Sequence, residues 1–299
     1  MNLVVFITTK GHNRVPQELR YSLYKPTMQN LIKQSDGDLS NLFKNKILNL
    51  KMFNGDELRA KEYIEYFKNL GFEIILHENK DQSIDDQTID SNRMKYMLGN
   101  YLNDLRQTYS LLTNFPEEHT FLYEDDCPII VERSNLKYQL DKSENLLKSN
   151  KHIGSVVFAR LVSMGRYVTP KFWYHATKLK NENGVVKNNG FNFQPGVRRT
   201  NELVNTANLI TQHWNSFIHL EPEEFFGLAF EQANGIKNLD HFALPFEDIY
   251  SLHLGDRYGG TIENHKDNRI DYDENLGYIL EKTRQPVEYN YGQNEWILK

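Results

Sequence analysis

The chain has 299 residues, of which 39% are hydrophobic and 12% aromatic, which is enough for a sizeable core and argues against a disordered protein. Its formal net charge of −5 argues against non-specific binding to nucleic acid. A single cysteine, Cys127, excludes an intrachain disulfide framework and the cysteine spacings of zinc clusters. Every apolar run is too short for a signal-peptide core or a membrane span, so we expect a cytoplasmic protein with no membrane span.

The first quarter of the chain predicts alternating strands and helices. Residues 3–7 form a β-branched and aromatic run, as in a buried parallel strand, and a polar loop follows at 8–12. Apolar spacing predicts helices over 19–33 and 56–70, and a second strand over 72–77. This order is typical of a strand–helix–strand unit whose ligand binds at the carboxyl edge of the sheet.

The next segment leads to the most informative motif of the chain. Residues 80–91 are acidic and lack apolar periodicity, which predicts a loop, and 92–112 show the spacing of a long amphipathic helix. A short apolar strand then ends in Glu124-Asp125-Asp126, and Cys127 after it is expected to be a buried, inert thiol.

The second half of the chain is less regular than the first. The predicted elements are helices over 135–147 and 222–234, strands over 153–159, 208–210 and 249–254, a hairpin or loop over 181–192, and a polar tail after the last strand. No internal repeat or flexible linker is visible, so the sequence predicts one unit with two halves.

Three consecutive carboxylates at the end of a strand are costly unless a positive charge lies among them. A divalent cation is the simplest such charge, and oxygen ligands favour Mg²⁺ or Mn²⁺ over softer metals. A solvated acidic turn after the strand is the alternative interpretation of the same residues.

In this order of elements, the chain resembles the GT-A type glycosyltransferases, and the Glu124-Asp125-Asp126 triplet is similar to the EDD form of their DxD motif. The resemblance extends loosely over residues 1 to about 260. It implies an α/β fold, a GT-A-like single domain with a mostly parallel central sheet and flanking helices. It also implies a nucleotide-sugar-binding half over 1–133, an acceptor-binding and catalytic half over 134–260, and a C-terminal tail over 261–299.

The resemblance further implies roles for individual residues. Asp126 and His253 are expected to bind Mn²⁺ or Mg²⁺, while Glu124 and Asp125 contact the donor or reach the metal through water. The candidates for the general base, which an inverting enzyme requires, are Asp248, Glu247 and Asp240. The other expected donor contacts, by their position near the phosphates or the nucleoside, are Thr8, Thr9, Lys10, Arg14 and Arg93, with Arg106 as a further cation. Residues 205–210 are similar, faintly, to the acceptor-side strand of such enzymes.

The implied activity is transfer of a sugar from a nucleotide-sugar, with a UDP-sugar as the first expectation, to an acceptor hydroxyl. The acceptor is a saccharide or, as an alternative, a hydroxymethylated pyrimidine in phage or viral DNA, in which case the enzyme works in the host cytoplasm. An aromatic and basic stretch over 171–180, with Arg198 and Arg199, would then contact the DNA backbone. Two further alternatives are a nucleotidyltransferase, which the single glycine of the 8–12 loop disfavours, and an inactive carbohydrate-binding protein.

Overall fold

The structure is a computed structural model that describes residues 1–9, 24–53, 55–79, 103–125, 127–131, 134–151, 153–158, 186–189, 195–213, 222–236, 240–243, 249–251, 287–290 and 295–298. The first half contains β1 (Asn2–Thr8), α2 (Tyr24–Gln34), β2 (Asn45–Phe53), α3 (Glu57–Asn69), β3 (Glu73–Asn79), a helix over residues 103–111, β4 (His119–Glu124) and β5 (Ile129–Val131). The second half contains α5 (Leu136–Ser149), β6 (Ile153–Val157), β7 (Val186–Asn189), β8 (Gly196–Arg199), α7 (Thr200–Gln212), α9 (Pro222–Asn234), β9 (Asp240–Ala243), β10 (Ile249–Ser251), β11 (Val287–Asn290) and β12 (Glu295–Leu298).

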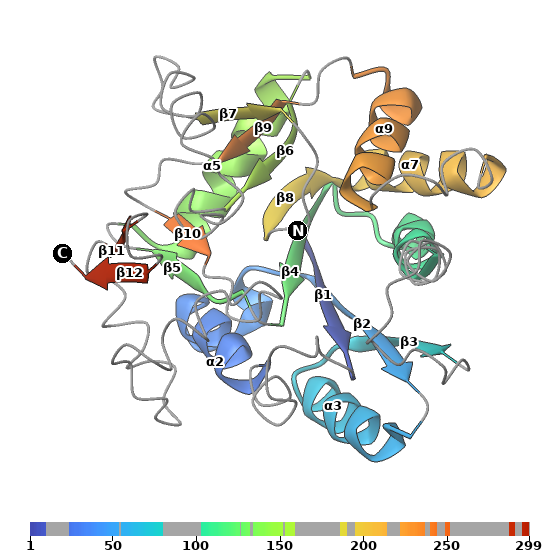
Figure 1. Ribbon diagram of the computed structural model, residues 1–299, viewed down its shortest axis with the longest axis vertical. Coiled ribbons are helices and arrows are strands. Elements are labelled where there is room, and N and C mark those ends of the chain that lie inside the picture. The colour runs from blue at the N-terminus through green and yellow to red at the C-terminus, as the bar shows by residue number, and fades with distance from the viewer. Residues whose placement is uncertain are drawn as a thin grey trace.

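The described strands form one large sheet and two small ones. The large sheet has eight strands in the order β3-β2-β1-β4-β8-β6-β9-β7 (Figure 1). The pairs among β3, β2, β1 and β4 are parallel, as is β6 with β9, whereas β8 and β7 are antiparallel to their neighbours. The protein is therefore an α/β protein with a mixed, mostly parallel sheet, as the sequence predicts.

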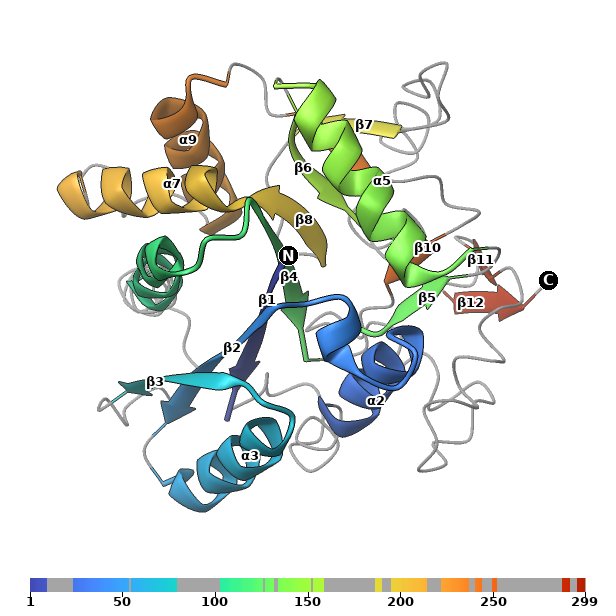
Figure 2. The same cartoon turned by 180° about the vertical axis from the view of Figure 1, so that it is seen from behind.

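Helices cover both faces of this sheet, because successive strand residues point to opposite sides. The odd-numbered positions of β1, such as Val5, pack with α2, α3 and α5 in one apolar cluster, whereas Val4 packs with the helix of residues 103–111, α7 and α9 in the other. Figure 2 shows α2, α3 and α5 from their own side of the molecule. The sheet is thus the middle of three layers.

The strand–helix–strand unit differs from the sequence prediction in one element. The sequence analysis overlooks β2, so the strand expected as the second one, at 72–77, is the third, β3. The segment of β2 carries Asn49 and Lys51 within an apolar run, and these polar positions break the pattern of a buried strand. Both residues have partners on the neighbouring helix, Thr108 for Asn49 and Asp104 for Lys51.

Most helices in the described part of the chain match their predictions to within a few residues. Helix α3 lies within 56–70, α5 begins after Asn135, whose side chain caps it, and α9 spans the predicted 222–234. The helix expected at 19–33 is described from Tyr24 onward as α2. The predicted loop at 80–91 lies outside the described residues.

One prediction for the second half is wrong, and the structure adds strands to two others. Residues 208–210 are not a strand but belong to α7, whose buried positions, such as Leu203 and Ile210, recur at helical spacing. Within the predicted hairpin or loop at 181–192, β7 is described as a strand that pairs with β9. The polar tail contains a hairpin, β11 with β12.

The large sheet joins the two halves of the chain. Strand β4 of the first half pairs with β8 of the second along four residue pairs, from His119 with Arg199 to Leu122 with Gly196. No helix among the described residues is long and apolar enough to cross a membrane.

Candidate functional site

The acidic triplet begins at the carboxyl end of β4, next to the carboxyl end of β1. The two strands pair in parallel up to Phe6 with Glu124, and the backbone N–H of Asp125 donates to the Phe6 carbonyl at 3.3 Å. From β1 the chain builds β2 and β3 on one side and then returns to place β4 on the other (Figure 1). The strand order therefore reverses between β1 and β4, and open α/β sheets bind ligands at such a reversal, outside the carboxyl ends of the strands.

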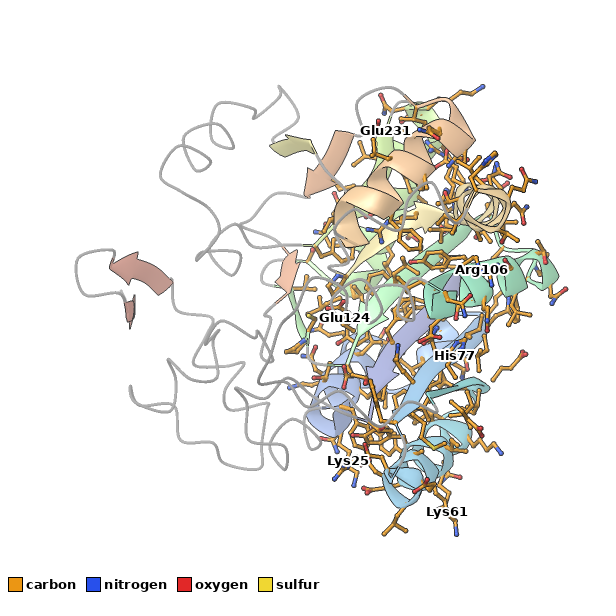
Figure 3. The ribbon with its side chains drawn as sticks, turned by 45° about the vertical axis from the view of Figure 1, so that its right-hand side comes forward. Lys25, Lys61, His77, Arg106, Glu124 and Glu231 are labelled. Atoms are coloured by element: carbon orange, nitrogen blue, oxygen red, sulfur yellow. The ribbon has the colours of Figure 1, made fainter. Side chains whose placement is uncertain are left out.

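The two described carboxylates of the triplet differ in burial, since Glu124 is half-buried and Asp125 is buried. Glu124 follows the even positions of β4 and accepts a hydrogen bond from the Cys127 thiol at 3.3 Å (Figure 3). Asp125, the turn residue that follows the strand, is only 4% exposed. Cys127 is fully buried, as predicted for a structural thiol. Asp126 lies outside the described residues.

The end of β1 is tied to the start of α3. The Thr9 hydroxyl donates to Asp56 Oδ2 at 3.1 Å and accepts from the Phe53 N–H at 3.0 Å. The Thr9 side chain is fully buried, so this hydroxyl fixes the loop between β2 and α3 instead of facing a donor. Thr8 is half-buried beside it, and Lys10 and Arg14 lie outside the described residues.

A cation that the sequence analysis missed lies at this same edge. Arg59 Nη1 donates to the Thr9 carbonyl at 3.3 Å and to Asp56 Oδ1 at 3.1 Å, and its side chain is 29% exposed. No motif singles out Arg59, since it is one of several charged residues on an amphipathic helix. Only the packing of α3 against the sheet brings its guanidinium to the end of β1.

The predicted site residues late in the chain flank strand β10. Strand β10 pairs antiparallel with β5, from Ile249 with Val131 to Ser251 with Ile129. Ser251, the last described residue of β10, therefore lies beside Ile129, two residues after Cys127 in the sequence. His253 itself lies outside the described residues, as do Glu247 and Asp248, which precede the opposite end of β10.

Asp240 is not brought together with the triplet. It begins β9 and pairs with Ile153 at the start of β6, which is the amino end of both strands. Glu124 ends β4 at the other edge of the sheet. At roughly 3.3 Å per residue, Asp240 is about 20 Å from Glu124 along the strand direction.

The two arginines proposed to contact DNA are both used inside the protein. Arg198 is 0% exposed. Arg199 donates to the carbonyls of Leu147, Asn150 and Ile153 and to the Glu202 carboxylate, and so caps the carboxyl end of α5. Neither side chain is available to a DNA backbone, which corrects that prediction. The stretch 171–180 lies outside the described residues.

A buried polar cluster lies beneath the same edge, between β2, β3 and the helix of residues 103–111. His77 Nε2 lies 3.2 Å from Asn49 Nδ2, and its Nδ1 lies 3.6 Å from Asp104 Oδ1. Asp104 Oδ2 also pairs with Lys51 at 2.9 Å. Burial lowers the pKa of His77, Asp104 raises it, and the Lys51 charge lowers it further. The imidazole is therefore held neutral.

Arg106 is attached to the helix side of the sheet. Its guanidinium donates to Asn103 Oδ1 at 2.6 Å and to Thr211 Oγ1 at 3.1 Å, which links the helix of residues 103–111 to α7 (Figure 3). These contacts favour a structural role over the phosphate contact that the sequence predicts. Arg93 lies outside the described residues.

The predicted metal ligands are of the kind that a hard cation prefers, although those among the described residues do not form a metal site by themselves. Among the described residues, no group of three or more His, Cys, Asp or Glu side chains could hold a metal ion. Asp125 supplies carboxylate oxygens of the kind that Mg²⁺ and Mn²⁺ prefer. A metal site here therefore requires the two predicted ligands outside the described ranges, Asp126 and His253.

Compared with models of known protein families and with curated proteins, the chain matches none of them.

Proposed function

We propose that this protein is a metal-dependent glycosyltransferase that moves a sugar from a nucleotide-sugar to an acceptor hydroxyl. The observation that carries the proposal is the start of the acidic triplet at the carboxyl end of β4, beside the end of β1, where the strand order reverses. A donor diphosphate at this edge would lie next to clustered carboxylates, a combination that calls for a bridging cation.

The expected roles depend on the charge of the leaving group. Asp126 and His253 would hold Mn²⁺ or Mg²⁺, which neutralises the negative charge that develops on the diphosphate as the glycosidic bond breaks. Asp125 would hold the metal through water or contact the ribose. Arg59, at the end of β1, adds a cation that can contact the donor phosphates.

Two observations bear on the base and the acceptor. Asp240 begins β9 at the far edge of the sheet, so we retain Glu247 and Asp248 as candidates for a base that deprotonates the acceptor hydroxyl. Arg198 and Arg199 serve internal contacts, so we take a saccharide as the first acceptor class and hydroxymethylated DNA as the second.

The decisive experiment is a donor-hydrolysis screen. The protein is incubated with UDP-, GDP-, ADP- and dTDP-sugars, with Mn²⁺, Mg²⁺ or a chelator, and with or without DNA containing hydroxymethylated pyrimidines. We expect metal-dependent release of sugar from one donor class. The proposal fails if no donor is hydrolysed and no nucleoside diphosphate binds in the presence of either metal.

Asp126→Asn should abolish that hydrolysis while leaving the fold intact, because the variant loses an interaction with an ion that binds from solvent. His253→Ala should raise the Mn²⁺ concentration needed for half-maximal rate, and added metal should partly restore the rate. The measurements are the initial rate across a Mn²⁺ titration and the Tm without metal. An unchanged rate in Asp126→Asn at saturating metal would end the metal role of the triplet.

Replacing the general base should lower kcat by roughly 10²- to 10⁴-fold with little change in donor binding. We expect this loss in Asp248→Asn or Glu247→Gln, and we expect Asp240→Asn, the matched control, to keep kcat within about threefold of wild type. The readout is transfer to the acceptor, together with nucleotide-dependent thermal stabilisation. A large loss in Asp240→Asn alone would contradict the assignment. Near-normal rates in all three would mean that the base lies elsewhere or that the reaction is retaining, which the anomeric configuration of the product distinguishes.

A further inference from the structure

A polar cluster joins the helix of residues 103–111 to β2 and β3. Its five side chains are those of Asn49, Lys51, His77, Asp104 and Thr108. Lys51 and His77 are paired residues of two neighbouring parallel strands, so their side chains lie side by side on one face of the sheet. Asp104 and Thr108 are four residues apart and therefore share one face of the helix. The cluster is thus a contact between the helix and these two strands.

This contact is shielded from water. His77 is 8% exposed, and Asn49 and Thr108 are buried more deeply still. The side chains of Lys51 and Asp104 are 13% and 14% exposed. Polar and charged groups are tolerated at such depth only when they are hydrogen-bonded or paired with an opposite charge. The attachment of the helix at this place therefore depends on every group of the cluster having its partner.

The hydrogen bonds of the cluster determine where the imidazole carries its proton. The Asn49 amide nitrogen donates to Thr108 Oγ1, and it lies 3.2 Å from His77 Nε2. An amide nitrogen can only donate, so Nε2 accepts and has no proton. The proton of the neutral ring is then on Nδ1, which faces Asp104 Oδ1 at 3.6 Å.

The charges of the cluster balance only while the imidazole is neutral. Asp104 Oδ2 pairs with Lys51 Nζ at 2.9 Å, so one carboxylate already faces one ammonium. These are the two charged groups that face His77, one from β2 and one from the helix, while the facing side chains of Asn49, Gln107 and Thr108 are uncharged. Burial and the Lys51 charge both lower the pKa of His77, against the opposing effect of Asp104.

Proton uptake by His77 would disturb the cluster in two ways. A proton on Nε2 would face the Asn49 amide nitrogen, so that one donor meets another. The cluster would also hold two cations and a single carboxylate, away from water. Both effects act on the groups that connect the helix to the sheet.

We propose that this cluster is a pH-sensitive latch, in which neutral His77 holds the helix of residues 103–111 on β2 and β3 and protonated His77 releases it. The latch lies next to the ligand edge of the sheet, since the Lys51 carbonyl accepts a hydrogen bond from the Thr9 N–H at 2.9 Å. The inference requires no particular substrate, so it stands or falls separately from the proposed glycosyltransferase activity.

Amide hydrogen exchange of the whole protein, followed by mass spectrometry at pH 7.0 and pH 5.5, tests the latch. Opening that takes up one proton becomes about tenfold more favourable for each pH unit below the ordinary pKa of 6.5, until the pH reaches the lowered pKa of the folded protein. After correction for the intrinsic pH dependence of exchange, the helix amides should exchange about tenfold faster at pH 5.5. Helix α3, on the other face of the sheet, is the internal reference and should not change.

His77→Gln removes the titrating group, so the exchange of the helix in this variant should differ by less than about twofold between the two pH values. His119→Gln is the matched control, because His119 is also buried beside a carboxylate but contacts another helix. Its Nδ1 lies 3.5 Å from Glu144 Oε1 of α5. This control should keep the wild-type response of the helix of residues 103–111.

Lys51→Met tests the charge balance by a second route, and it replaces His77→Gln if that variant does not fold. Without the ammonium, Asp104 is left to balance a protonated imidazole. The acceleration at pH 5.5 should therefore fall to about threefold or less.

Equal exchange of the wild-type helix at the two pH values would overturn the proposal. So would a tenfold response that persists in His77→Gln or in Lys51→Met, because the proton would then act elsewhere. An equal acceleration in α3 would show that acid loosens the molecule as a whole, and this outcome also contradicts a local latch.

Discussion

At the scale of single residues, the structure separates side chains that look alike in the sequence. Arg198 and Arg199 are adjacent, yet Arg198 is fully buried opposite Thr120 of β4 and Arg199 caps α5. Thr9 has a hydroxyl suited to a donor contact, but this hydroxyl joins β1 to Asp56. In each case the role of the side chain depends on the strand face that it occupies or on the helix next to it. The residue type alone reveals neither of these.

His77 offers a prediction about pH at this scale. Burial holds its pKa below the ordinary value of 6.5, although Asp104 acts in the other direction. Below that pH the unfolded chain binds a proton that the folded chain does not, so the free energy of unfolding falls as the pH drops toward the folded pKa. We expect His77→Gln to be less stable than wild type at pH 7 and to lose less stability between about pH 6.5 and pH 5.

Urea unfolding at a series of pH values measures this difference. The quantity to compare is the change in unfolding free energy between the two ends of the pH range, for wild type and His77→Gln. Parallel curves for the two proteins would mean that the imidazole titrates in the same way in the folded and unfolded chain, against the prediction.

At the scale of elements, the close contact of β8 with β6 is specified by a glycine. A Cβ atom on Gly196 would lie 2.5 Å from the Val156 carbonyl oxygen and 3.0 Å from Val157 Cα, both of them backbone atoms. Backbone cannot rotate away as a flexible side chain can, so the two strands would have to separate. Gly196 also pairs with Leu122 of β4, so this contact lies next to the place where the two halves of the chain meet.

Gly196→Ala should therefore lower the free energy of unfolding by about 2 kcal/mol or more. Gly235→Ala is the control, since Gly235 has a φ of +64° and no atom within 4 Å of the added Cβ. It should cost about 1 kcal/mol, from backbone strain alone. Chemical denaturation of both variants decides the matter, and equal losses would show that β8 and β6 can shift to make room.

At the scale of the whole molecule, the eight-stranded sheet crosses the predicted boundary between the two halves near residue 133. Hydrogen bonds from β4 to β8 and from β5 to β10 connect strands of the two halves. The apolar clusters do the same, since one contains Val5 and Leu140 and the other contains Val4 and Phe230. Neither half can therefore bury its apolar surface without the other.

We expect the two halves to unfold in a single transition. All three tryptophans, Trp173, Trp214 and Trp296, follow residue 133, so tryptophan fluorescence reports on the part of the chain after the first half. Far-ultraviolet circular dichroism reports on all helices and strands. The two signals should give the same urea midpoint. A fluorescence midpoint distinct from that of circular dichroism would indicate halves that unfold separately.

Local patterns in the sequence determined the elements and the motif. Apolar spacing located α3, α5 and α9, and the run at 3–7 located β1, because helix and strand periods are properties of neighbouring residues. The same reasoning placed the carboxylates at the end of a strand, which the structure identifies as β4. This reasoning failed for β2, because Asn49 and Lys51 interrupt its apolar run. It also failed for 208–210, a short segment with two apolar residues that resembles a strand but lies inside α7.

Only the tertiary structure decided the order of the strands and the contacts that this order creates. Four features depend on contacts between residues far apart in the chain. They are the pairing of β4 with β1, the position of Asp240 at the opposite edge of the sheet, the contact of Arg59 with the end of β1, and the burial of Arg198. Such contacts leave no local period, because a charged residue on a strand or helix has the same neighbours in sequence whether the fold buries it or exposes it. The acidic triplet could thus be recognised from the chain alone, whereas the burial of Arg198 could not.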